Sequence, residues 1–393
     1  MRIGVLGGGQ LARMLAEAGL PLGIDFDFLD PKSEICAARY GRHIQAEWDD
    51  PSALEMLARC DRITCDFENV PAGVLDALAR HSLVRPGATA LAAAQDRLTE
   101  KELFRDLGLE TPEFAAVDSR PDLHAAVERI GLPSVLKTRR MGYDGKGQMV
   151  LRDAEDLELA WQKLGGQALI LERWVDFDHE CSITAVRAAD GALRCWPLTR
   201  TWHDDGILRL AWAPSRVAGQ LQRRAESLIT RLAEKLDYVG CLTLELFVGD
   251  AFDEPDRDGL ERRLIANEFA PRVHNSAHWT IEAAQCSQFE NHLRAVCGWP
   301  LGETHAVGQA LMVNFIGELP PIARWLATSG LHWHDYGKSA RPGRKVGHAT
   351  LVGDNPEQLV TRVAGLRNQL DSRSNQALDS MAADSRGSNS TRC

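Results

Sequence analysis

The sequence predicts a multidomain protein of the α/β and α+β classes that begins with an α/β domain built on a parallel sheet. Three observations support this. The chain has 393 residues, more than one hydrophobic core usually organises, so two or three domains are expected. Its 44% hydrophobic and 25% charged residues are ordinary for a soluble globular protein. Short apolar runs alternate with helical patterns over residues 1 to about 90, as strands and covering helices do.

The first strand is predicted at residues 3–6, followed by a glycine turn and a helix over residues 10–18. Gly7-x-Gly9-x-x-Ala12 suits a backbone that approaches a phosphate, and the N-terminus of the helix favours an anion. The next strand ends at Asp30, where a dinucleotide-binding fold carries its ribose-binding acid. The pattern predicts a Rossmann-like domain, although any turn near a phosphate needs the same glycines. Its remaining elements are a second strand at 26–29, helices at 53–58 and 71–79, and a strand at 62–67.

A helix is predicted over residues 88–107, with Gly108 as its C-terminal cap and Pro112 shortly beyond, so this pair marks a candidate boundary. A later strand ends at Lys137 and is followed by three glycines within residues 142–147 and then by another strand. Glycines flanked by cations between two strands predict a flexible hairpin whose N–H groups cover a polyphosphate. The segment does not match the Walker motif, which disfavours a P-loop NTPase.

Acids occur inside apolar strands further along the chain. Glu245 lies within the run at 242–248, and Glu268 within the run at 264–269. Carboxylates in such places are costly unless something pairs with them, and a shared Mg²⁺ would satisfy both. Between the hairpin and these acids, the strand at 168–175 leads into a segment whose backbone suits an adenine edge.

Composition excludes several classes of protein. The formal charge of −10 argues against nonspecific binding to nucleic acid or to anionic membranes. The nine cysteines include no C-x-x-C pair, which disfavours a zinc ribbon or a disulfide framework and favours a reducing cytoplasm. No signal peptide and no membrane span are expected.

Several motifs carry a resemblance to a known family. The strand end at Lys137, the hairpin at 142–148, the 172–175 segment and the two acids are arranged as in ATP-grasp ligases, which hold ATP between two subdomains. Residues 267–280, NEFAPRVHNSAHWT, are similar to the signature of the 5-(carboxyamino)imidazole ribonucleotide synthase family. Residues 341–348, RPGRKVGH, resemble the C-terminal motif of that family, and the likeness extends from Arg2 to about Leu366.

The resemblance implies a Rossmann-like domain at 1–94, an ATP-grasp lid subdomain with connecting helices at 95–178, an ATP-grasp core subdomain at 179–300 and a C-terminal domain at 301–370 that completes the substrate site. The first βα turn would then face the acceptor substrate and bind no nicotinamide, with Asp30 a plain turn acid. Residues 371–393 are rich in Ser, Asn, Asp and Ala and are expected to be a disordered tail.

The activity implied is ATP-dependent carboxylation, by bicarbonate, of the exocyclic amine of 5-aminoimidazole ribonucleotide in de novo purine biosynthesis. Phosphoryl transfer would give carboxyphosphate, and that anhydride or the CO₂ it releases would be captured by the amine. ATP, Mg²⁺ and bicarbonate are the implied cofactors and co-substrate. The resemblance also suggests a homodimer, located in the cytoplasm.

The resemblance assigns the site residues as well. Catalytic roles fall on Lys137, Glu268 and Arg272, and metal binding on Glu245 and Glu268. The implied ATP contacts are Arg97, Lys137, Gly142, Tyr143, Asp144, Gly145, Lys146, Gly147, Gln148, Glu172, Arg173, Trp174, Val175, Glu180, His203, Asn267 and Glu268. The implied contacts to the ribonucleotide, with cations serving its 5′-phosphate, are Gln10, Leu11, Glu68, Tyr143, Asp144, Arg272, His274, Asn275, Lys338, Arg344 and Lys345.

Three other functions stay open at this point. A formate-dependent glycinamide ribonucleotide transformylase would use the same scaffold with another small carboxylate. A nicotinamide-dependent oxidoreductase would use the N-terminal glycines and leave the hairpin unexplained. A noncatalytic nucleotide sensor would bind ATP and release no phosphate.

Overall fold

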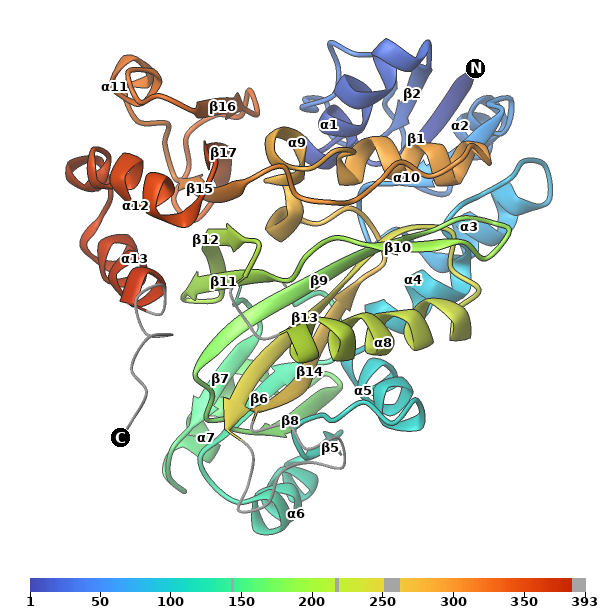
Figure 1. Ribbon diagram of the computed structural model, residues 1–393. Coiled ribbons are helices and arrows are strands. Elements are labelled where there is room, and N and C mark those ends of the chain that lie inside the picture. The colour runs from blue at the N-terminus through green and yellow to red at the C-terminus, as the bar shows by residue number, and fades with distance from the viewer. Residues whose placement is uncertain (143–144, 216–218, 251–261, 384–393) are drawn as a thin grey trace.

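A computed structural model describes residues 1–142, 145–215, 219–250 and 262–383 of the chain. In these ranges the strands form three sheets, two of four strands and one of nine. Figure 1 shows the N-terminal sheet at the top, the other small sheet at the bottom and the large sheet between them. Tyr143 and Asp144, expected to contact both ATP and the ribonucleotide, lie outside the described residues.

The N-terminal domain has the parallel sheet that the sequence predicts. Its strands lie in the order β3-β2-β1-β4, and each of these pairings is parallel. The predicted strand at 62–67 ends at Cys65, so Asp66 directly follows the carboxyl end of that strand. The elements are β1 (Arg2–Leu6), α1 (Gln10–Gly19), η1 (Leu20–Leu22), β2 (Asp25–Leu29), β3 (Arg42–Ile44), α2 (Pro51–Ala58), β4 (Arg62–Cys65) and α3 (Ala72–Ala79).

The single helix predicted at 88–107 is wrong, because α4 (Ala88–Gln95) and α5 (Arg97–Asp106) meet at a break. Asp96 has an extended backbone there, and its carboxylate accepts a hydrogen bond from the Leu98 N–H at 3.0 Å. An acid so placed satisfies a free N–H at the start of a helix and begins α5 anew. Gly108 follows α5 at φ +67°, the left-handed backbone expected of the predicted cap.

The second small sheet carries the glycine hairpin. Its order is β5-β8-β6-β7, with antiparallel pairings throughout. Lys137 in β6 pairs with Gln148 in β7, which confirms the predicted arrangement of strand, glycine loop and strand. The elements of this lid subdomain are β5 (Phe114–Val117), α6 (Arg120–Ile130), β6 (Ser134–Thr138), β7 (Gln148–Leu151), α7 (Asp156–Leu164) and β8 (Leu169–Arg173).

The nine-stranded sheet joins the core subdomain to the C-terminal domain. Its order is β14-β13-β9-β11-β12-β15-β17-β16, with β10 beside β9, and its strands pair antiparallel. The β12–β15 pairing continues the sheet across the boundary expected at residue 300. The core elements are β9 (His179–Arg187), β10 (Leu193–Cys195), β11 (Thr199–Asp204), β12 (Ile207–Ala213), α8 (Gly219–Lys235), β13 (Gly240–Asp250), β14 (Arg262–Ala270), η2 (Asn275–Ala277), α9 (Thr280–Ala283) and α10 (Gln288–Cys297).

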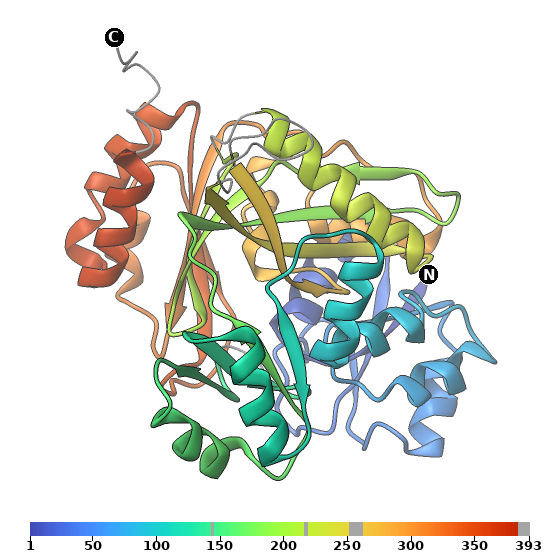
Figure 2. The same cartoon turned by 90° about the horizontal axis from the view of Figure 1, so that it is seen from below.

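The chain beyond Leu370 is not the disordered tail that its composition predicts, because a helix forms there. Ala377 and Leu378 of this helix, α13, are buried, and Arg373 pairs with Asp204 at the end of β11. Figure 2 shows the C-terminal helices, in red, on the outer side of the sheet. Residues 384–393 lie outside the described residues. The C-terminal elements are β15 (Gln309–Ile316), α11 (Ile322–Leu326), β16 (Leu331–Asp335), β17 (Lys345–Gly353), α12 (Pro356–Ala364), η3 (Arg367–Gln369) and α13 (Ser372–Ala383).

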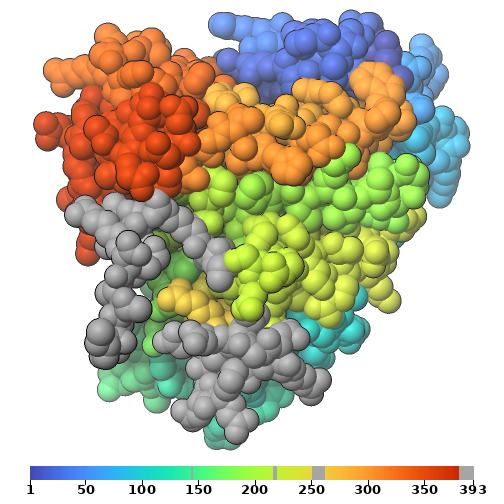
Figure 3. Space-filling view, in the orientation of Figure 1, coloured from blue at the N-terminus to red at the C-terminus, as the bar shows by residue number. Residues whose placement is uncertain are grey.

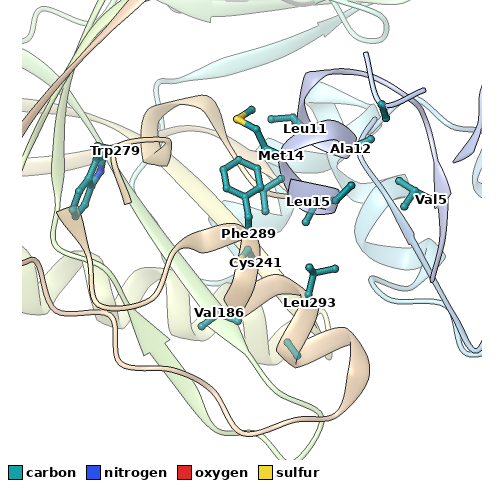
Figure 4. Close-up of a cluster of buried hydrophobic side chains, with 14 of the residues drawn as sticks. Val5, Leu11, Ala12, Met14, Leu15, Val186, Cys241, Trp279, Phe289 and Leu293 are labelled. Atoms are coloured by element: carbon teal, nitrogen blue, oxygen red, sulfur yellow. The ribbon is translucent and has the colours of Figure 1, made fainter. Parts of the chain in front are cut away.

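An apolar interface between α1 and α10 fixes the N-terminal domain to the rest of the molecule. Figure 4 shows Leu11, Met14 and Leu15 of α1 beside Phe289 and Leu293 of α10, all of them buried. In Figure 3 the orange segment that contains α10 lies between the blue N-terminal domain and the green strands. Burial of apolar surface stabilises such a contact by about 25 cal/mol per Å². No helix in the described ranges is long and apolar enough to cross a membrane.

Candidate active site

Two carboxylates face each other at the centre of the candidate site. Glu245 in β13 and Glu268 in β14 are partners in the strand register, beside a bulge in the ladder. Directly opposed residues point to the same face of a sheet, with Cβ atoms about 5 Å apart. Glu268 Oε2 accepts a hydrogen bond from Arg97 Nη1 at 2.9 Å, and Glu245 Oε1 lies 3.1 Å from His274 Nε2. The acids therefore share one site, with a guanidinium on one side and an imidazole on the other.

Burial and mutual repulsion oppose full ionisation of this carboxylate pair, and a divalent cation between the two groups would offset both effects. Burial raises the pKa of Glu245 to about 7, against the charge of His203, and the charge of Glu268 adds to the rise. Burial acts in the same direction on Glu268, but Arg97 holds the pKa of that carboxyl below its ordinary value. In the described ranges no group of three or more His, Cys, Asp or Glu side chains is placed to hold a metal. The two carboxylates in register fit Mg²⁺, which takes one or two carboxylates and fills its shell with phosphate oxygens and water.

Two lysines share one buried carboxylate on the lid side of the pair. Glu172 Oε2 lies 2.9 Å from Lys137 Nζ and 3.4 Å from Lys101 Nζ. Burial opposes ionisation of Glu172, but the two ammonium groups lower its pKa to about 2. Burial also lowers the pKa of Lys137. The Glu172 side chain is thus held by the lysines, and the adenine contact predicted for this residue stays a prediction for its backbone.

The end of β8 differs from the prediction in one side chain. Arg173 was expected at the nucleotide, but its guanidinium pairs with Glu113 at 2.8 Å on the surface. The backbone N–H of Trp174 donates to the Pro133 carbonyl at 3.1 Å, and the residue is 44% exposed. Val175 follows in irregular structure. Adenine contacts by the backbone of this segment stay a prediction.

Glu180 and His203 form a second acidic and basic pair, on β9 and β11. His203 Nδ1 lies 2.7 Å from Glu180 Oε2. Burial lowers the pKa of His203, but the hydrogen bond and charge of Glu180 outweigh it and raise the pKa to about 9. Both groups also influence the pKa of Glu245, which places them beside the central carboxylates. Their predicted contact with the nucleotide stays a prediction.

Gly145 of the glycine hairpin lies close to the turn between β11 and β12. A Cβ atom on Gly145 would lie 2.3 Å from the carbonyl oxygen of Asp205, too close for any other residue. Gly145 and Gly147 also have φ of +73° and +72°, a conformation that glycine adopts without strain. Arg97 Nη2 donates to the Gly142 carbonyl at 3.5 Å. Gly142 therefore lies beside Arg97, and Gly145 lies beside the β11–β12 turn.

Arg272, two residues beyond the end of β14, pairs with Glu68 of the N-terminal domain. The Arg272 Nε group donates to Glu68, and Nη1 donates to the Val273 carbonyl at 3.1 Å. Burial raises the pKa of Glu68, but Arg272 reverses this and holds it below the ordinary value. Asn275 is 7% exposed, and neither polar atom of its side chain has a hydrogen-bond partner in the described ranges. An unpaired buried amide costs about 1–3 kcal/mol, so Asn275 suits a group reserved for a ligand.

The first glycine turn binds the protein's own carboxylates. The N–H groups of Gly9 and Ala12 donate to Asp66 Oδ2 at 2.8 and 3.1 Å. The Gly8 N–H donates to Asp30 Oδ2 at 3.0 Å. The anion expected at the N-terminus of α1 is therefore Asp66. Asp30 was expected to be a plain turn acid and instead supports the glycine turn.

Gln10 connects the N-terminal and C-terminal domains. Lys338 Nζ donates to Gln10 Oε1 and lies 5.5 Å from the centre of the Tyr336 ring. Burial lowers the pKa of Lys338 to about 8. Leu11 was expected at the ribonucleotide, but its side chain is buried in the cluster of Figure 4. Only the backbone of Leu11 remains to face a ligand.

Two further cations predicted at the 5′-phosphate lie at the start of β17. Arg344 Nη1 donates to Ser339 Oγ at 2.8 Å. The next residue, Lys345, influences the pKa of both Lys338 and Glu245. The charge of Lys345 therefore reaches the central carboxylates as well as the Gln10–Lys338 contact.

Two buried residues of α5 belong to the site although the sequence did not predict them there. Lys101 Nζ donates to the Asn267 carbonyl at 2.6 Å, and Glu100 accepts from the Phe269 N–H at 2.7 Å. Hydrophobic periodicity assigns charged helix residues to solvent. The available signal was spacing, because both lie three or four positions before buried Phe104 and so share its face.

Family models cover most of the chain. The ribonucleotide synthetase preATP-grasp domain matches residues 1–95, and the ATP-grasp domain matches residues 102–289. The C-terminal domain of phosphoribosylaminoimidazole carboxylase matches residues 310–362. These matches confirm the predicted fold class of a Rossmann-like domain, an ATP-grasp fold and a small C-terminal domain.

Known proteins are similar over nearly the whole length. The chain is 52% identical over 365 residues to an N5-carboxyaminoimidazole ribonucleotide synthase of Pseudomonas aeruginosa, covering 93% of this chain and 98% of the relative. A crystal structure of the synthetase from Thermus thermophilus matches with a TM-score of 0.87 and 48% identity, covering 94% and 98%. The Aspergillus clavatus synthase in complex with ADP and 5-aminoimidazole ribonucleotide matches with a TM-score of 0.83 and 27% identity, covering 97% and 98%.

Proposed function

This chain belongs to the N5-carboxyaminoimidazole ribonucleotide synthase family, and from that premise we propose how its residues carboxylate 5-aminoimidazole ribonucleotide. The chain is an ATP-dependent ligase that forms a carbon–nitrogen bond in purine biosynthesis. Neither a formate-dependent transformylase nor a nicotinamide-dependent oxidoreductase fits this family. The observation that carries the proposal is the Glu245–Glu268 pair, in which Glu268 meets the guanidinium of Arg97 and Glu245 lies beside His274.

ATP binds between the lid and core subdomains. Lys137 and Arg97 neutralise its phosphates, and the glycine hairpin covers them with backbone N–H groups. Glu180 and His203 serve the ribose, and the backbone of residues 172–175 meets the adenine. Glu245 and Glu268 would hold Mg²⁺, which would supply Lewis-acid stabilisation to the phosphate oxygens when bound.

In the first step a bicarbonate oxygen attacks the γ-phosphorus of ATP. The bond from that phosphorus to the β–γ bridging oxygen breaks, so ADP leaves and carboxyphosphate forms. Negative charge grows on the bridging oxygen during the transfer, and Lys137 and Arg97 offset it. The planar donor fork of Arg272 orients the bicarbonate oxygens.

In the second step the exocyclic amine attacks the carboxyl carbon of carboxyphosphate, or of the CO₂ released from it. The carbon–oxygen bond to phosphate breaks, phosphate leaves, and the amine nitrogen passes a proton to the departing phosphate. The product is the N5-carbamate. His274 and Asn275 contact the ribonucleotide, and Lys338, Arg344 and Lys345 meet its 5′-phosphate.

Water must stay out of the site while carboxyphosphate exists, because water hydrolyses it. The close contact of Gly145 with Asp205 supports a role of the hairpin as the cover that excludes water. A bulkier residue at position 145 would hold this cover open.

The proposal is tested by measuring phosphate release with Mg²⁺ and ATP while one substrate at a time is omitted. Release should need the ribonucleotide and bicarbonate together, and should fall to background ATP hydrolysis without either one. Turnover sustained by formate in CO₂-depleted buffer, or release independent of the ribonucleotide, would contradict it.

We propose in addition that the chain works as a homodimer in the cytoplasm, as the family resemblance implies. Light scattering during gel filtration tests the assembly. A monomer at micromolar concentration would contradict it.

A further inference from the structure

Two buried carboxamides on α10 make the same kind of contact with different loops. Gln288 Oε1 accepts from the His274 N–H at 2.8 Å, and Gln288 Nε2 donates to the His274 carbonyl at 2.7 Å. Asn291 Oδ1 accepts from the Gly302 N–H at 2.7 Å, and its Nδ2 donates to the Gly302 carbonyl at 3.1 Å. Both side chains are fully buried. One clamp thus fixes a residue of the candidate site, and the other fixes a loop that contributes no predicted site residue.

The orientation of the Gln288 amide is unambiguous. A backbone N–H only donates and a carbonyl only accepts, so the oxygen and nitrogen of the side chain cannot be exchanged. The second Nε2–H then points to His278 Nδ1, at 3.1 Å. The backbone of Gln288 is held too, since its N–H donates to Thr280 Oγ1 at 3.0 Å and its carbonyl accepts from Cys241 Sγ.

The His274 ring is orientated by its own contacts. The Ser276 N–H donates to Nδ1 at 3.3 Å and Ser276 Oγ lies 2.9 Å from the same nitrogen, and from the backbone donor we assign the ring proton to Nε2. That proton faces Glu245 Oε1, 3.1 Å away. Gln288 thus holds the backbone N–H and carbonyl of His274, while Ser276 and Glu245 hold its two ring nitrogens.

Because α10 also packs against α1, the clamp is anchored on a rigid element. Ser287 caps α10 by accepting from the Glu290 N–H at 3.1 Å, and Phe289 and Leu293 bury their side chains against α1. A displacement of Gln288 therefore requires movement of the whole helix.

We propose that Gln288 is a positioning residue for the carboxylation reaction. Its carboxamide fixes the backbone of His274 and thereby places the imidazole ring between Glu245 and the acceptor amine. The inference rests on the proposed function. Gln288 touches neither substrate nor reacting atoms, so it acts only through His274. A misplacement of about 1 Å at a reacting group costs on the order of a hundredfold in rate.

The test compares Gln288→Leu with Asn291→Leu in the full chain. Each variant removes a buried clamp on a backbone N–H and carbonyl from the same helix, and Gln288→Leu also removes the contact with His278, so it should lower the melting temperature at least as far as Asn291→Leu. Gln288→Leu should lower kcat by about tenfold or more at unchanged KM for ATP, whereas Asn291→Leu should keep kcat within about twofold. Equal kcat values for the two variants would overturn the proposal.

A second variant gives a readout that a merely structural role would not produce. In Gln288→Glu the ionised carboxylate faces the His274 carbonyl and repels it, whereas the protonated carboxyl donates to that carbonyl and restores the clamp. Burial raises the pKa of such a carboxyl by several units. The kcat of this variant, relative to the parent, should therefore rise as pH falls from about 8 to 6. A ratio independent of pH would count against the clamp.

The controls separate this inference from the proposed function. An inactive parent chain would refute the carboxylation reaction itself. An active parent with Gln288→Leu equal to Asn291→Leu would refute only the role of Gln288.

Discussion

The two sides of the Glu245–Glu268 pair are built differently. On the lid side, buried charges already face opposite charges: Glu172 lies between two lysines, and Arg97 pairs with Glu268. On the acceptor side, Asn275 is buried with both side-chain polar atoms unpartnered in the described part of the chain. The acceptor side also pairs its charges, Arg272 with Glu68, but it keeps a buried amide with neither polar atom bonded, whereas the lid side leaves the single oxygen Glu172 Oε1 without a partner in the described ranges.

The largest effect is expected on the lid side. Lys137→Ala and Glu268→Gln should each lower kcat by about a hundredfold or more, because each removes charge that acts on the transferred phosphoryl group. Steady-state phosphate release measures this. A kcat within about threefold of the parent would show that Lys137 and Glu268 do not act on the transferred phosphoryl group.

Arg272→Ala should separate the two sides. The ribonucleotide-dependent rate should fall by about a hundredfold, because the carboxyl oxygens lose their orienting donor. Background hydrolysis of ATP by water should change little, since Lys137, Arg97 and the carboxylate pair are intact. Phosphate release measured with and without ribonucleotide distinguishes these rates. An equal loss in both rates would show that Arg272 acts on phosphoryl transfer, as the lid residues do.

A smaller effect is expected at Asn275. Asn275→Leu should raise KM for the ribonucleotide by about fivefold at unchanged KM for ATP, since one polar pairing is worth about 1 kcal/mol. The free protein should also gain about 1 kcal/mol in free energy of unfolding, because an unpaired amide is replaced by an apolar group. Urea denaturation tests this. A loss of stability would show that the amide has a partner in the free protein.

The smallest effect concerns pH. The folded pKa of His203, about 9, lies above its unfolded value of about 6.5. The protonated ring thus stabilises the fold below pH 6.5, and this contribution is lost as pH rises through about 9. In His203→Gln the melting temperature should fall less over this range than in the parent. The same dependence of melting temperature on pH in the parent and in His203→Gln would contradict the Glu180–His203 ion pair.

The parts of the fold that sequence predicts are those with local patterns. The parallel N-terminal strands follow from apolar runs and glycines, and the hairpin after Lys137 follows from three glycines between strands. The helix break at Asp96 and helix α13 were missed, since a single cap and a few buried alanines and leucines leave weak local signals.

The site itself depends on long-range contacts. Lys101 meets Asn267 across 166 positions of sequence, so periodicity within α5 gives no indication of it. Leu11 turns inward and Arg173 turns to Glu113 because neighbouring elements offer an apolar surface and a carboxylate. The resemblance supplied the remaining residues, and their roles stay predictions until the variants are measured.

The most direct test is a crystal structure of the chain with Mn²⁺ and ATP, using anomalous scattering to locate the ion. We expect the ion between the carboxylates of Glu245 and Glu268, in contact with oxygens of the triphosphate. An ion and triphosphate bound instead at the glycine turn after β1 would contradict the account.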